Sequence, residues 1–315
     1  MISFFVNNIW VLQMIIVNIM GGLGNQMFQY AAAKHLSIIN RTMLKIDAAN
    51  FRKLTANKEH VFQLNCFNIS AEQARRNEIR KHKKTRNATG HIFDLITRRF
   101  VPSKAKPGLL YNEPDGSEFK PGFLELGPDR YLIGYFNSYK YFASIRDILM
   151  EEYIPRNGVS VQAREVIEQV EKANSVSVHI RRGDYVDDPN VRKDIEGIIT
   201  DGYYRNAIEF ISSKIVNPHF FIFSNDMNWV RANFKMPFKV TYVDINPPQR
   251  GYEDLWIMSR CKHNITAGGS TFSWWAAYLN RNIDKIVVRT EKISNDPRYN
   301  HPGDYFPPGW EIVAS

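Results

Sequence analysis

The strongest constraint on the fold is an alternation of short apolar segments with helical segments that begins near Val159. The apolar segments have the length of buried strands, and the segments between them place apolar residues at helical spacing. Strands separated by helices of this length predict βαβ units, a parallel sheet and right-handed crossovers. The predicted strands are SVSVHI, HFFIFS, KVTYVDI, HNITA and KIVVR, and the predicted helices are GYYRNAIEFISSKI, NDMNWVRANF, GYEDLWIMSRC and STFSWWAAYLN.

A second α/β unit is predicted near the start of the chain. The apolar segment MIIVNIM runs into the glycine-rich turn GGLGNQ, an alanine-rich helix follows, and TMLKIDA is the next strand. Asn25 is the predicted N-cap of that helix. Two such units predict an α/β protein with two Rossmann-like domains facing a cleft, spanning residues 14–155 and 156–315. Residues 1–13 are interpreted as an N-terminal extension.

The region between these two units is less regular and rich in aromatic residues. Six of them fall between Tyr131 and Phe142, which is too many for the buried face of one helix. Two interpretations are open: these aromatic side chains line a groove, or they pack against the other domain.

The composition indicates a globular protein. With 315 residues, 44% of them hydrophobic and 23% charged, the chain is long enough for two domains. Its two cysteines exclude a disulfide scaffold and favour a reducing compartment, and no Cys/His cluster has zinc-site spacing. Asparagines interrupt the uncharged N-terminal stretch, which leads into the first predicted strand. We therefore expect a cytoplasmic protein without a membrane span.

The net charge of +9 is concentrated in residues 75–106, which carry eleven Lys or Arg residues against two acidic ones. One interpretation is a solvated basic helix with its following loop. Others are peripheral contact with an anionic membrane at its inner face, or attraction of a phosphate-bearing acceptor. Nucleic acid is not an expected partner, because the segment lacks the aromatic platforms of single-strand binders.

Four predicted strand-to-helix junctions carry the groups of one candidate ligand site. Such junctions meet at the carboxyl edge of an open α/β sheet, where ligands bind. Gly22 and Gly24 let the backbone approach a ligand closely, and the amides of the next helix favour an anion. Ser270 and Thr271 present hydroxyls at another predicted helix start, which suits a phosphate.

The junction FSND admits two roles. Ser224 and Asn225 are good helix-capping residues, which is the structural interpretation. Asp226 is a candidate acceptor of hydrogen bonds from a base or a ribose, as acidic groups beyond strands often are.

The junction SVHIRRGDYV supplies positive charge. Alternate side chains of a strand face opposite sides, so His179 and Arg181 share one face, while Arg182 and Asp184 lie in the turn beyond. The Asp-x-Asp motif with which Mg²⁺-dependent glycosyltransferases bind their metal is absent from the chain. Without a metal, the negative charge of a leaving diphosphate must be neutralised by arginine, whose planar fork binds phosphate oxygens through two bonds. Together the four junctions predict a metal-independent sugar-nucleotide site. The alternative for this junction is a purely structural role as a surface ion-pair cluster.

MGGLGNQMFQYA, HIRRGDY, FSND and HNITAGGSTFSWWAAYL resemble, in this order, the motifs of the bacterial α1,2-fucosyltransferases of glycosyltransferase family 11. The resemblance implies a GT-B-like arrangement, GDP-fucose as donor substrate, no cofactor, no metal, and inversion at the fucose anomeric carbon. It places the acceptor on residues 14–155 and GDP-fucose on residues 156–315. The implied acceptor is the 2-hydroxyl of a terminal galactose on an oligosaccharide or lipid-linked glycan, as in O-antigen biosynthesis.

The resemblance also implies roles for individual residues. Arg181 would bind the β-phosphate and stabilise departing GDP, with His179 against the diphosphate or the fucose, where the charged imidazole would be favoured. The base is left open among Asp184, Asp187 and Asp188, and Asp184 is alternatively an ion-pair partner of an arginine. The implied catalytic residues are Arg181, His179 and Asp184, and the implied donor-binding residues are Gly22, Gly24, Asn25, Gln26, His179, Arg181, Arg182, Ser224, Asp226, Ser270, Thr271 and Phe272.

Three other functions stay open at this point. They are a fucosyltransferase of another linkage, a non-catalytic sugar-nucleotide binder, and a nucleic-acid-binding protein that uses residues 75–106.

Overall fold

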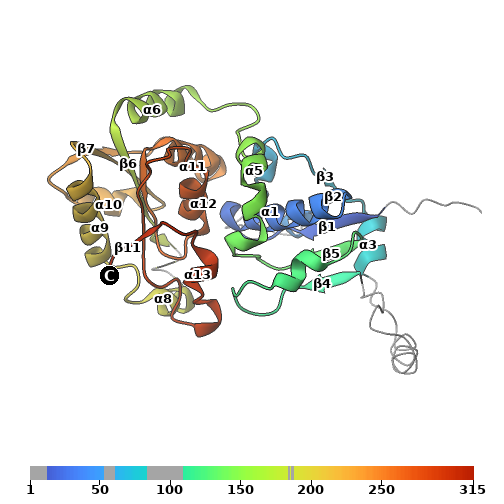
Figure 1. The fold of residues 1–315 in the computed structure, drawn as a ribbon. Coiled ribbons are helices and arrows are strands. Elements are labelled where there is room, and N and C mark those ends of the chain that lie inside the picture. Colours follow the sequence, from blue (N-terminus) through green and yellow to red (C-terminus); the bar gives the residue numbers. More distant parts are fainter. Residues whose placement is uncertain (1–12, 53–60, 84–108, 184, 186–187) are drawn as a thin grey trace, which may run out of the picture.

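The computed structural model describes residues 13–52, 61–83, 109–183, 185 and 188–315. Residues 1–12 of the predicted extension, residues 84–106 of the basic segment and Asp184 lie outside the described residues. Two parallel sheets lie at opposite ends of the molecule, with helices packed between them (Figure 1). This arrangement confirms the predicted α/β fold with two Rossmann-like domains, and it is GT-B-like.

Five short strands form the first sheet: β1 (Met14–Asn18), β2 (Met43–Asp47), β3 (Glu72–Gln73), β4 (Leu110–Asn112) and β5 (Arg130–Ile133). They are all parallel, in the order β3-β2-β1-β5-β4. The predicted strands β1 and β2 are confirmed, and helix α1 (Leu23–Ile39) connects them. The sequence did not predict β3, β4 and β5, which come from the irregular region. The short helices of this domain are α2 (Ala49–Arg52), α3 (Arg76–Lys83) and α5 (Arg146–Glu152).

Six strands form the second sheet: β6 (Asn174–Ile180), β7 (Pro218–Ser224), β8 (Lys239–Tyr242), β9 (His263–Ile265), β10 (Val287–Arg289) and β11 (Glu311–Ile312). They are parallel, in the order β11-β10-β9-β6-β7-β8. The five predicted strands and the four predicted helices are confirmed. Those helices are α9 (Asp201–Lys214), α10 (Met227–Asn233), α11 (Gly251–Arg260) and α12 (Thr271–Leu279). Helices α6 (Val161–Lys172), α8 (Pro189–Ile195) and α13 (Pro302–Tyr305) complete the domain.

Strand β6 lies between β7 and β9, and side chains on both of its faces are buried. Val176 and Val178 pack into an apolar cluster, whereas Ser177 on the other face accepts a hydrogen bond from Asn264 Nδ2 at 2.7 Å. The motif after β6 therefore leaves the sheet at a central strand. The predicted domain boundary at residue 155 falls between the two sheets and stays a prediction.

The two domains meet through aromatic side chains. The ring of Phe28 on α1 lies 4.5 Å from that of Trp274 on α12, centroid to centroid. The ring of Trp275 lies 5.2 Å from Phe142 and 5.1 Å from Tyr153, both from the first domain. Trp274 and Trp275 are fully buried, so α12 is a central part of the domain interface.

This packing confirms, for part of the aromatic region, the interpretation that its side chains pack against the other domain. Phe142 packs against the second domain, while Phe136 and Tyr141 fill the core of the first domain. Tyr135 is exposed. None of the six aromatic side chains lines the cavity between the domains, and a groove lined by the exposed ones elsewhere stays a prediction.

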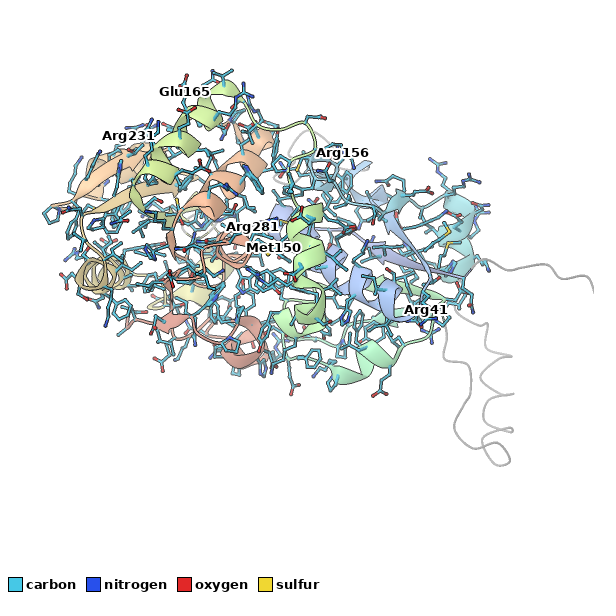
Figure 2. All side chains as sticks on the ribbon, turned by 45° about the horizontal axis from the view of Figure 1, so that its top comes forward. Arg41, Met150, Arg156, Glu165, Arg231 and Arg281 are labelled. Carbon is cyan, nitrogen blue, oxygen red and sulfur yellow. The ribbon has the colours of Figure 1, made fainter. Side chains whose placement is uncertain are left out.

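Polar contacts also join the domains near the surface. Arg281 donates hydrogen bonds to the Met150 carbonyl at 3.2 Å and to Glu151 Oε1 at 2.6 Å, both on α5 (Figure 2). Cys66 and Cys261 are both free thiols. Among the helices of the described residues, none has the length and apolar character needed to cross a bilayer.

Candidate functional site

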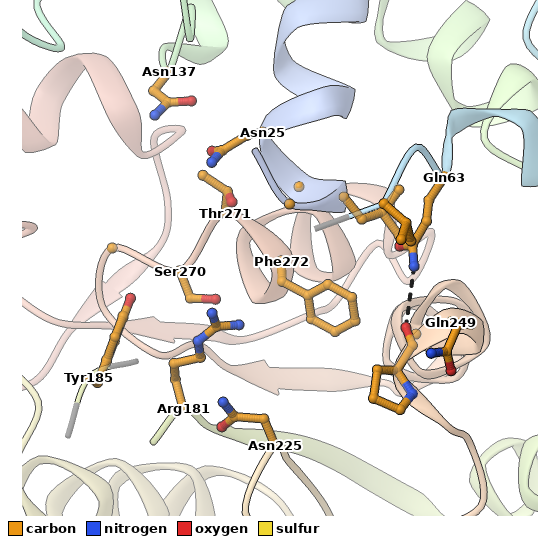
Figure 3. A pocket seen from close by; sticks show the side chains of 17 residues that line it. Asn25, Gln63, Asn137, Arg181, Tyr185, Asn225, Gln249, Ser270, Thr271 and Phe272 are labelled. Atoms are coloured by element: carbon orange, nitrogen blue, oxygen red, sulfur yellow. Dashed lines mark hydrogen bonds between the residues drawn. The ribbon is translucent and has the colours of Figure 1, made fainter. Parts of the chain in front are cut away.

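A cavity of about 690 Å³ lies between the two domains (Figure 3), within the usual size range of a small-molecule site. Arg181 carries the only charge among the described lining residues, and none of them is a carboxylate. The first domain contributes Gly22, Leu23, Gly24, Asn25, Val61, Gln63 and Asn137. The second domain contributes Arg181, Tyr185, Asn225, Pro248, Gln249, Gly251, Gly269, Ser270, Thr271 and Phe272.

The glycine-rich turn brings the start of α1 to this cavity. Gly21 has a φ of +74°, which a glycine adopts without strain, and Gly22 is the N-cap. The prediction that Asn25 caps the helix is therefore wrong, because the glycine turn starts the helix at Leu23. Asn25 lies in the first turn and lines the cavity instead. The first amides of α1 have no partner within the helix and favour an anion.

The start of α12 meets the start of α1 at the same place. A Cβ atom on Gly24 would lie 2.5 Å from both the backbone carbon and Oγ1 of Thr271. Trp275 Nε1 donates a hydrogen bond to the Gly24 carbonyl at 3.0 Å. Gly24 therefore allows two helix N-termini from different domains to lie side by side, which makes a strong seat for a negatively charged group.

Ser270 makes no hydrogen bond with its hydroxyl to the helix that it precedes. It is the N-cap of α12, yet its side chain makes no capping hydrogen bond, and its buried Oγ has no partner among the described residues. Ser160 and Thr200, the N-caps of α6 and α9, do accept capping hydrogen bonds from backbone amides. Because buried hydroxyls are normally partnered, the unpartnered Oγ beside the cavity makes Ser270 a candidate ligand contact.

The two consecutive arginines point to different places. Arg181 lines the cavity, with its guanidinium carbon 5.7 Å from the centre of the Tyr185 ring. The guanidinium of Arg182 lies 3.5 Å from the centre of the Trp229 ring on α10, and its Nε is 3.4 Å from Asp226 Oδ2. Of the two arginines, Arg181 alone lines the cavity, and a contact of Arg182 with the same ligand stays a prediction.

The FSND junction is used mainly for capping. Asp226, rather than Ser224 or Asn225, is the N-cap of α10 and accepts a hydrogen bond from the Trp229 amide at 3.1 Å. Ser224 Oγ accepts one from the Asp226 amide at 3.0 Å. Asn225 Oδ1 accepts one from the Arg182 amide at 2.9 Å, and Asn225 alone of the three lines the cavity. Donor contacts by Ser224 and Asp226 stay predictions.

His179 lies behind the cavity wall. It is 5% exposed, and its ring centre lies 5.4 Å from that of Phe272. Burial, together with the nearby charge of Arg181, lowers the pKa of His179 to about 3. In the free site the imidazole is therefore neutral at neutral pH and a weak base, while a charged imidazole beside a bound diphosphate stays a prediction.

Gln26 is fully buried and shapes the cavity from behind. Its side chain donates to the carbonyls of Gly21 at 2.9 Å and Val61 at 2.8 Å, and accepts from the Gln63 amide at 2.9 Å. Gln63 Nε2 in turn donates to the Pro248 carbonyl of the second domain at 3.2 Å (Figure 3). The structure thus gives Gln26 a positioning role.

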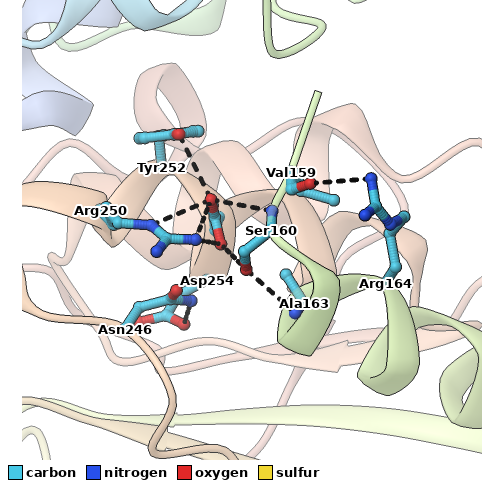
Figure 4. A network of polar contacts seen from close by, with 9 residues as sticks. Val159, Ser160, Ala163, Arg164, Asn246, Arg250, Tyr252 and Asp254 are labelled. Carbon is cyan, nitrogen blue, oxygen red and sulfur yellow. Dashed lines mark hydrogen bonds and ion pairs between the residues drawn. The ribbon is translucent and has the colours of Figure 1, made fainter. Parts of the chain in front are cut away.

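The loop between β8 and α11 is a fifth junction that the sequence reasoning passed over. It brings Pro248 and Gln249 to the cavity. Behind it, the buried Glu253 accepts hydrogen bonds from Arg250 Nη2 at 2.7 Å and from Ser160 Oγ at 2.7 Å (Figure 4). The rule that ligands bind where strands end would have found this loop.

Gln63, Asn137, Asn225 and Tyr185 are further cavity residues that were not predicted. Asn225 and Tyr185 lie within motifs that were singled out, whereas Gln63 and Asn137 come from the irregular region and carried no signal. The candidate bases Asp184 and Asp187 lie outside the described residues. No group of three His, Cys, Asp or Glu residues suited to a metal ion is found in the part of the chain that the structure describes.

The sequence of the chain is similar to those of known proteins. Residues 113–314 match the family described as Glycosyl transferase family 11. An alpha-1,2-colitosyltransferase of Escherichia coli is 31% identical over 87% of this chain and 89% of its own length. The O-antigen biosynthesis glycosyltransferase WbnK of the same species is 30% identical over 86% and 92%.

More distant proteins resemble the chain over most of its length. Galactoside alpha-(1,2)-fucosyltransferase 2 of Rattus norvegicus is 25% identical over 94% of this chain and 76% of its own. A crystal structure of NodZ alpha-1,6-fucosyltransferase with GDP aligns with 84% of this chain and 91% of that one, at 12% identity and a TM-score of 0.48. On the family match and the identity to the bacterial relatives, the chain belongs to glycosyltransferase family 11.

Proposed function

We propose that the protein transfers L-fucose from GDP-fucose, with inversion and without a metal ion, to the 2-hydroxyl of a terminal galactose on a glycan. The observation that carries this proposal is the meeting of Arg181 with the N-termini of α1 and α12 in one interdomain cavity. These groups provide positive potential without a metal, which is what a leaving nucleoside diphosphate requires.

In the proposed reaction, the 2-hydroxyl oxygen of galactose forms a bond to the anomeric carbon of fucose. The bond from that carbon to the β-phosphate oxygen breaks, and GDP leaves with the electron pair. Negative charge grows on the β-phosphate as the bond breaks, so preorganised donors there stabilise the transition state more than the ground state. The hydroxyl proton passes to a carboxylate of the loop that holds Asp184, or to the departing phosphate.

The two ends of the cavity suit different parts of the donor. Gln63 and Gln249 lie at one end, Asn137 and Tyr185 lie toward the other, and Arg181 lies between (Figure 3). The aromatic ring of Phe272 and the apolar ring of Pro248 near the glutamines suit a nucleobase. We place the diphosphate at Arg181 and Ser270, and the transferred sugar at the end formed by Asn137 and Tyr185.

A nucleotide-activated colitose is the second candidate donor. The observation that favours it is the 31% identity to an alpha-1,2-colitosyltransferase, against 25% to an alpha-(1,2)-fucosyltransferase. Colitose is L-fucose without its 3-hydroxyl group. A site that hydrogen-bonds this hydroxyl rejects the sugar that lacks it, whereas an apolar site discriminates weakly.

The test is transfer by the purified protein in the presence of EDTA. GDP-fucose and GDP-colitose are each offered with a panel of galactosides, GDP release is measured, and the product linkage is determined by NMR. We expect an α1,2-linked fucosyl galactoside whose rate of formation is unchanged by EDTA. Loss of activity under EDTA, another linkage, or transfer of colitose alone would contradict the proposal.

A further inference from the structure

The backbone at residues 134–138 has an unusual conformation where it faces the cavity. Phe136 has a φ of +52° although it is a large, fully buried side chain. The Ser138 amide donates to the Phe136 carbonyl at 2.8 Å, which closes a three-residue turn centred on Asn137. A left-handed conformation at such a residue is unfavourable and persists only where the surroundings impose it.

Glu113 imposes this turn from within the first domain. Its Oε2 accepts hydrogen bonds from the backbone amides of Tyr135 at 2.7 Å and Phe136 at 2.8 Å. The backbone of Gly134 passes so close that a Cβ atom there would lie 2.4 Å from Glu113 Cβ. The carboxyl group is largely buried, and no chemistry derived above uses it. A buried acid that binds two consecutive amides fixes the backbone between them.

The second domain holds the same turn from the other side. Ser138 Oγ donates to the Asp304 carbonyl at 2.6 Å, and Lys140 Nζ lies 2.5 Å from Asp304 Oδ1 on α13. The Asp304 carboxylate also accepts a hydrogen bond from the Phe119 amide at 2.9 Å. The turn is therefore fixed by both domains at once, and its position depends on how the two domains pack together.

The result of this arrangement is the placement of Asn137. Its side chain lines the cavity and lies near Asn25 and Thr271, the residues of the two helix starts (Figure 3). Its Oδ1 atom is buried and has no hydrogen-bond partner among the described residues. An unpartnered acceptor beside a cavity can take a hydrogen bond from a donor group of the ligand. A diphosphate offers none, whereas a sugar carries several hydroxyl groups, and the sugar is the part of the donor that adjoins the β-phosphate.

We propose that Asn137 accepts a hydrogen bond from a hydroxyl group of the transferred sugar, and that Glu113 is the positioning residue that holds Asn137 in place. The inference rests on the proposed function, since it takes the ligand to be a sugar nucleotide with its diphosphate at Arg181. It makes the first domain a recognition element for the donor sugar.

Binding measurements separate this inference from the proposed function. Calorimetry with GDP and with GDP-fucose is compared for the wild-type protein and for Asn137→Ala. We expect the affinity for GDP-fucose to fall about tenfold, as for loss of one neutral hydrogen bond, and the affinity for GDP to change less than twofold. An equal fall for both ligands, no fall for either, or a loss confined to the KM of the galactoside acceptor overturns the inference.

A second pair of variants tests Glu113. Glu113→Gln keeps an oxygen that accepts from both amides, so it should bind GDP-fucose as the wild type does. Glu113→Ala should reproduce the sugar-specific loss of Asn137→Ala, with GDP affinity unchanged. Asn206→Ala, on the outer surface of α9, is the matched control and should change neither affinity. If Glu113→Ala weakens GDP and GDP-fucose equally, the positioning role is wrong.

Transfer assays on the same proteins judge the proposed function. If the wild-type protein binds GDP-fucose but transfers no fucose to any galactoside, the proposed function fails, while the binding comparison still decides the role of Asn137. If transfer proceeds and Asn137→Ala is indistinguishable from the wild type in both assays, the inference fails alone.

Discussion

The two walls of the cavity are built on different plans. The second domain presents charge and hydroxyl groups, Arg181 and Ser270, at the ends of regular strands and at the start of a helix. The first domain presents backbone amides at the start of α1 and the neutral side chains of Gln63 and Asn137, which come from irregular segments. The comparison teaches that charge stabilisation follows from sheet topology, whereas recognition depends on loops that individual hydrogen bonds hold in place.

The largest loss of activity is expected from substitution of Arg181, in the wall formed by the second domain. Arg181→Ala should reduce kcat by on the order of 10²–10³, about 3–4 kcal/mol, because a preorganised donor to the departing phosphate is lost. Arg181→Lys should not restore the rate, since an ammonium group cannot reproduce the two-pronged contact. The measurement is steady-state GDP release, with the melting temperature as a check on folding.

Arg182→Ala is the matched control for this prediction. Its guanidinium stacks on Trp229 and faces Asp226, so its removal should cost less than about tenfold in kcat. If Arg182→Ala impairs turnover as much as Arg181→Ala does, the division of roles between the two arginines is wrong.

The stability of the protein should depend on pH through Glu113, which lies behind the first wall. Burial raises the pKa of this carboxyl from 4.5 to about 7, against the opposing hydrogen bonds from the amides of Phe136 and Tyr135. Its contribution to stability is therefore full below pH 4.5 and is lost as the pH rises to 7. Glu113→Gln does not titrate, so its stability relative to the wild type should grow by up to about 3 kcal/mol over that interval. Urea unfolding at several pH values measures the difference.

The second wall has a counterpart to Glu113 in Asp254. Burial raises the pKa of Asp254 to about 7, and Asn246 Nδ2 donates to its Oδ1 at 2.7 Å behind the loop that carries Gln249. Asp254→Asn should show the same sign of pH dependence. A relative stability that stays constant with pH for both variants would contradict the effect of burial on these two carboxyls.

Contact between the walls is tested at Gly24. Gly24→Ala introduces a Cβ atom 2.5 Å from the backbone of Thr271, so the two helix starts must separate. Overpacking of this kind costs about 1–3 kcal/mol, and we expect both a lower melting temperature and weaker GDP binding. Gly122→Ala is the control, because a Cβ atom there meets nothing within 4 Å. Equal melting temperatures for the two variants would remove the argument for a close approach.

The same difference between the walls explains how far the sequence could predict the molecule. Strands of the second sheet are apolar and lie between amphipathic helices, so periodicity located all but the two-residue β11. In the first sheet, β3 has two residues and β4 three, which is too short for periodicity to register. Those strands form because β2 and β5 offer edges for pairing, to β3 and β4 respectively, which is a tertiary effect.

The site divides in the same way. Residues at strand ends, such as Arg181 and Ser270, could be predicted, since topology alone brings them together. The distinct orientations of Arg181 and Arg182 could not, because they depend on Trp229 and Asp226, which lie more than forty residues further along the chain. Asn137 could not be predicted either. Its placement needs the carboxylate of Glu113, which follows β4, and the backbone carbonyl of Asp304 on α13.

The smallest predicted effect compares two hydroxyl groups at helix starts. Thr200 Oγ1 accepts a hydrogen bond from the Tyr203 amide at 3.0 Å, whereas the buried Ser270 Oγ has no partner among the described residues. Thr200→Ala should lower the stability by about 1 kcal/mol and leave GDP affinity unchanged, because only a cap is lost.

Ser270→Ala should do the reverse. Removing a buried hydroxyl that has no protein partner leaves the stability of the free protein unchanged or slightly raised. The affinity for GDP should fall by about three- to tenfold, since one hydrogen bond to the diphosphate disappears. Thermal melting with and without GDP measures both quantities on one sample. A stability loss at Ser270 equal to that at Thr200, with GDP affinity intact, would mean that this hydroxyl serves the helix and not the ligand.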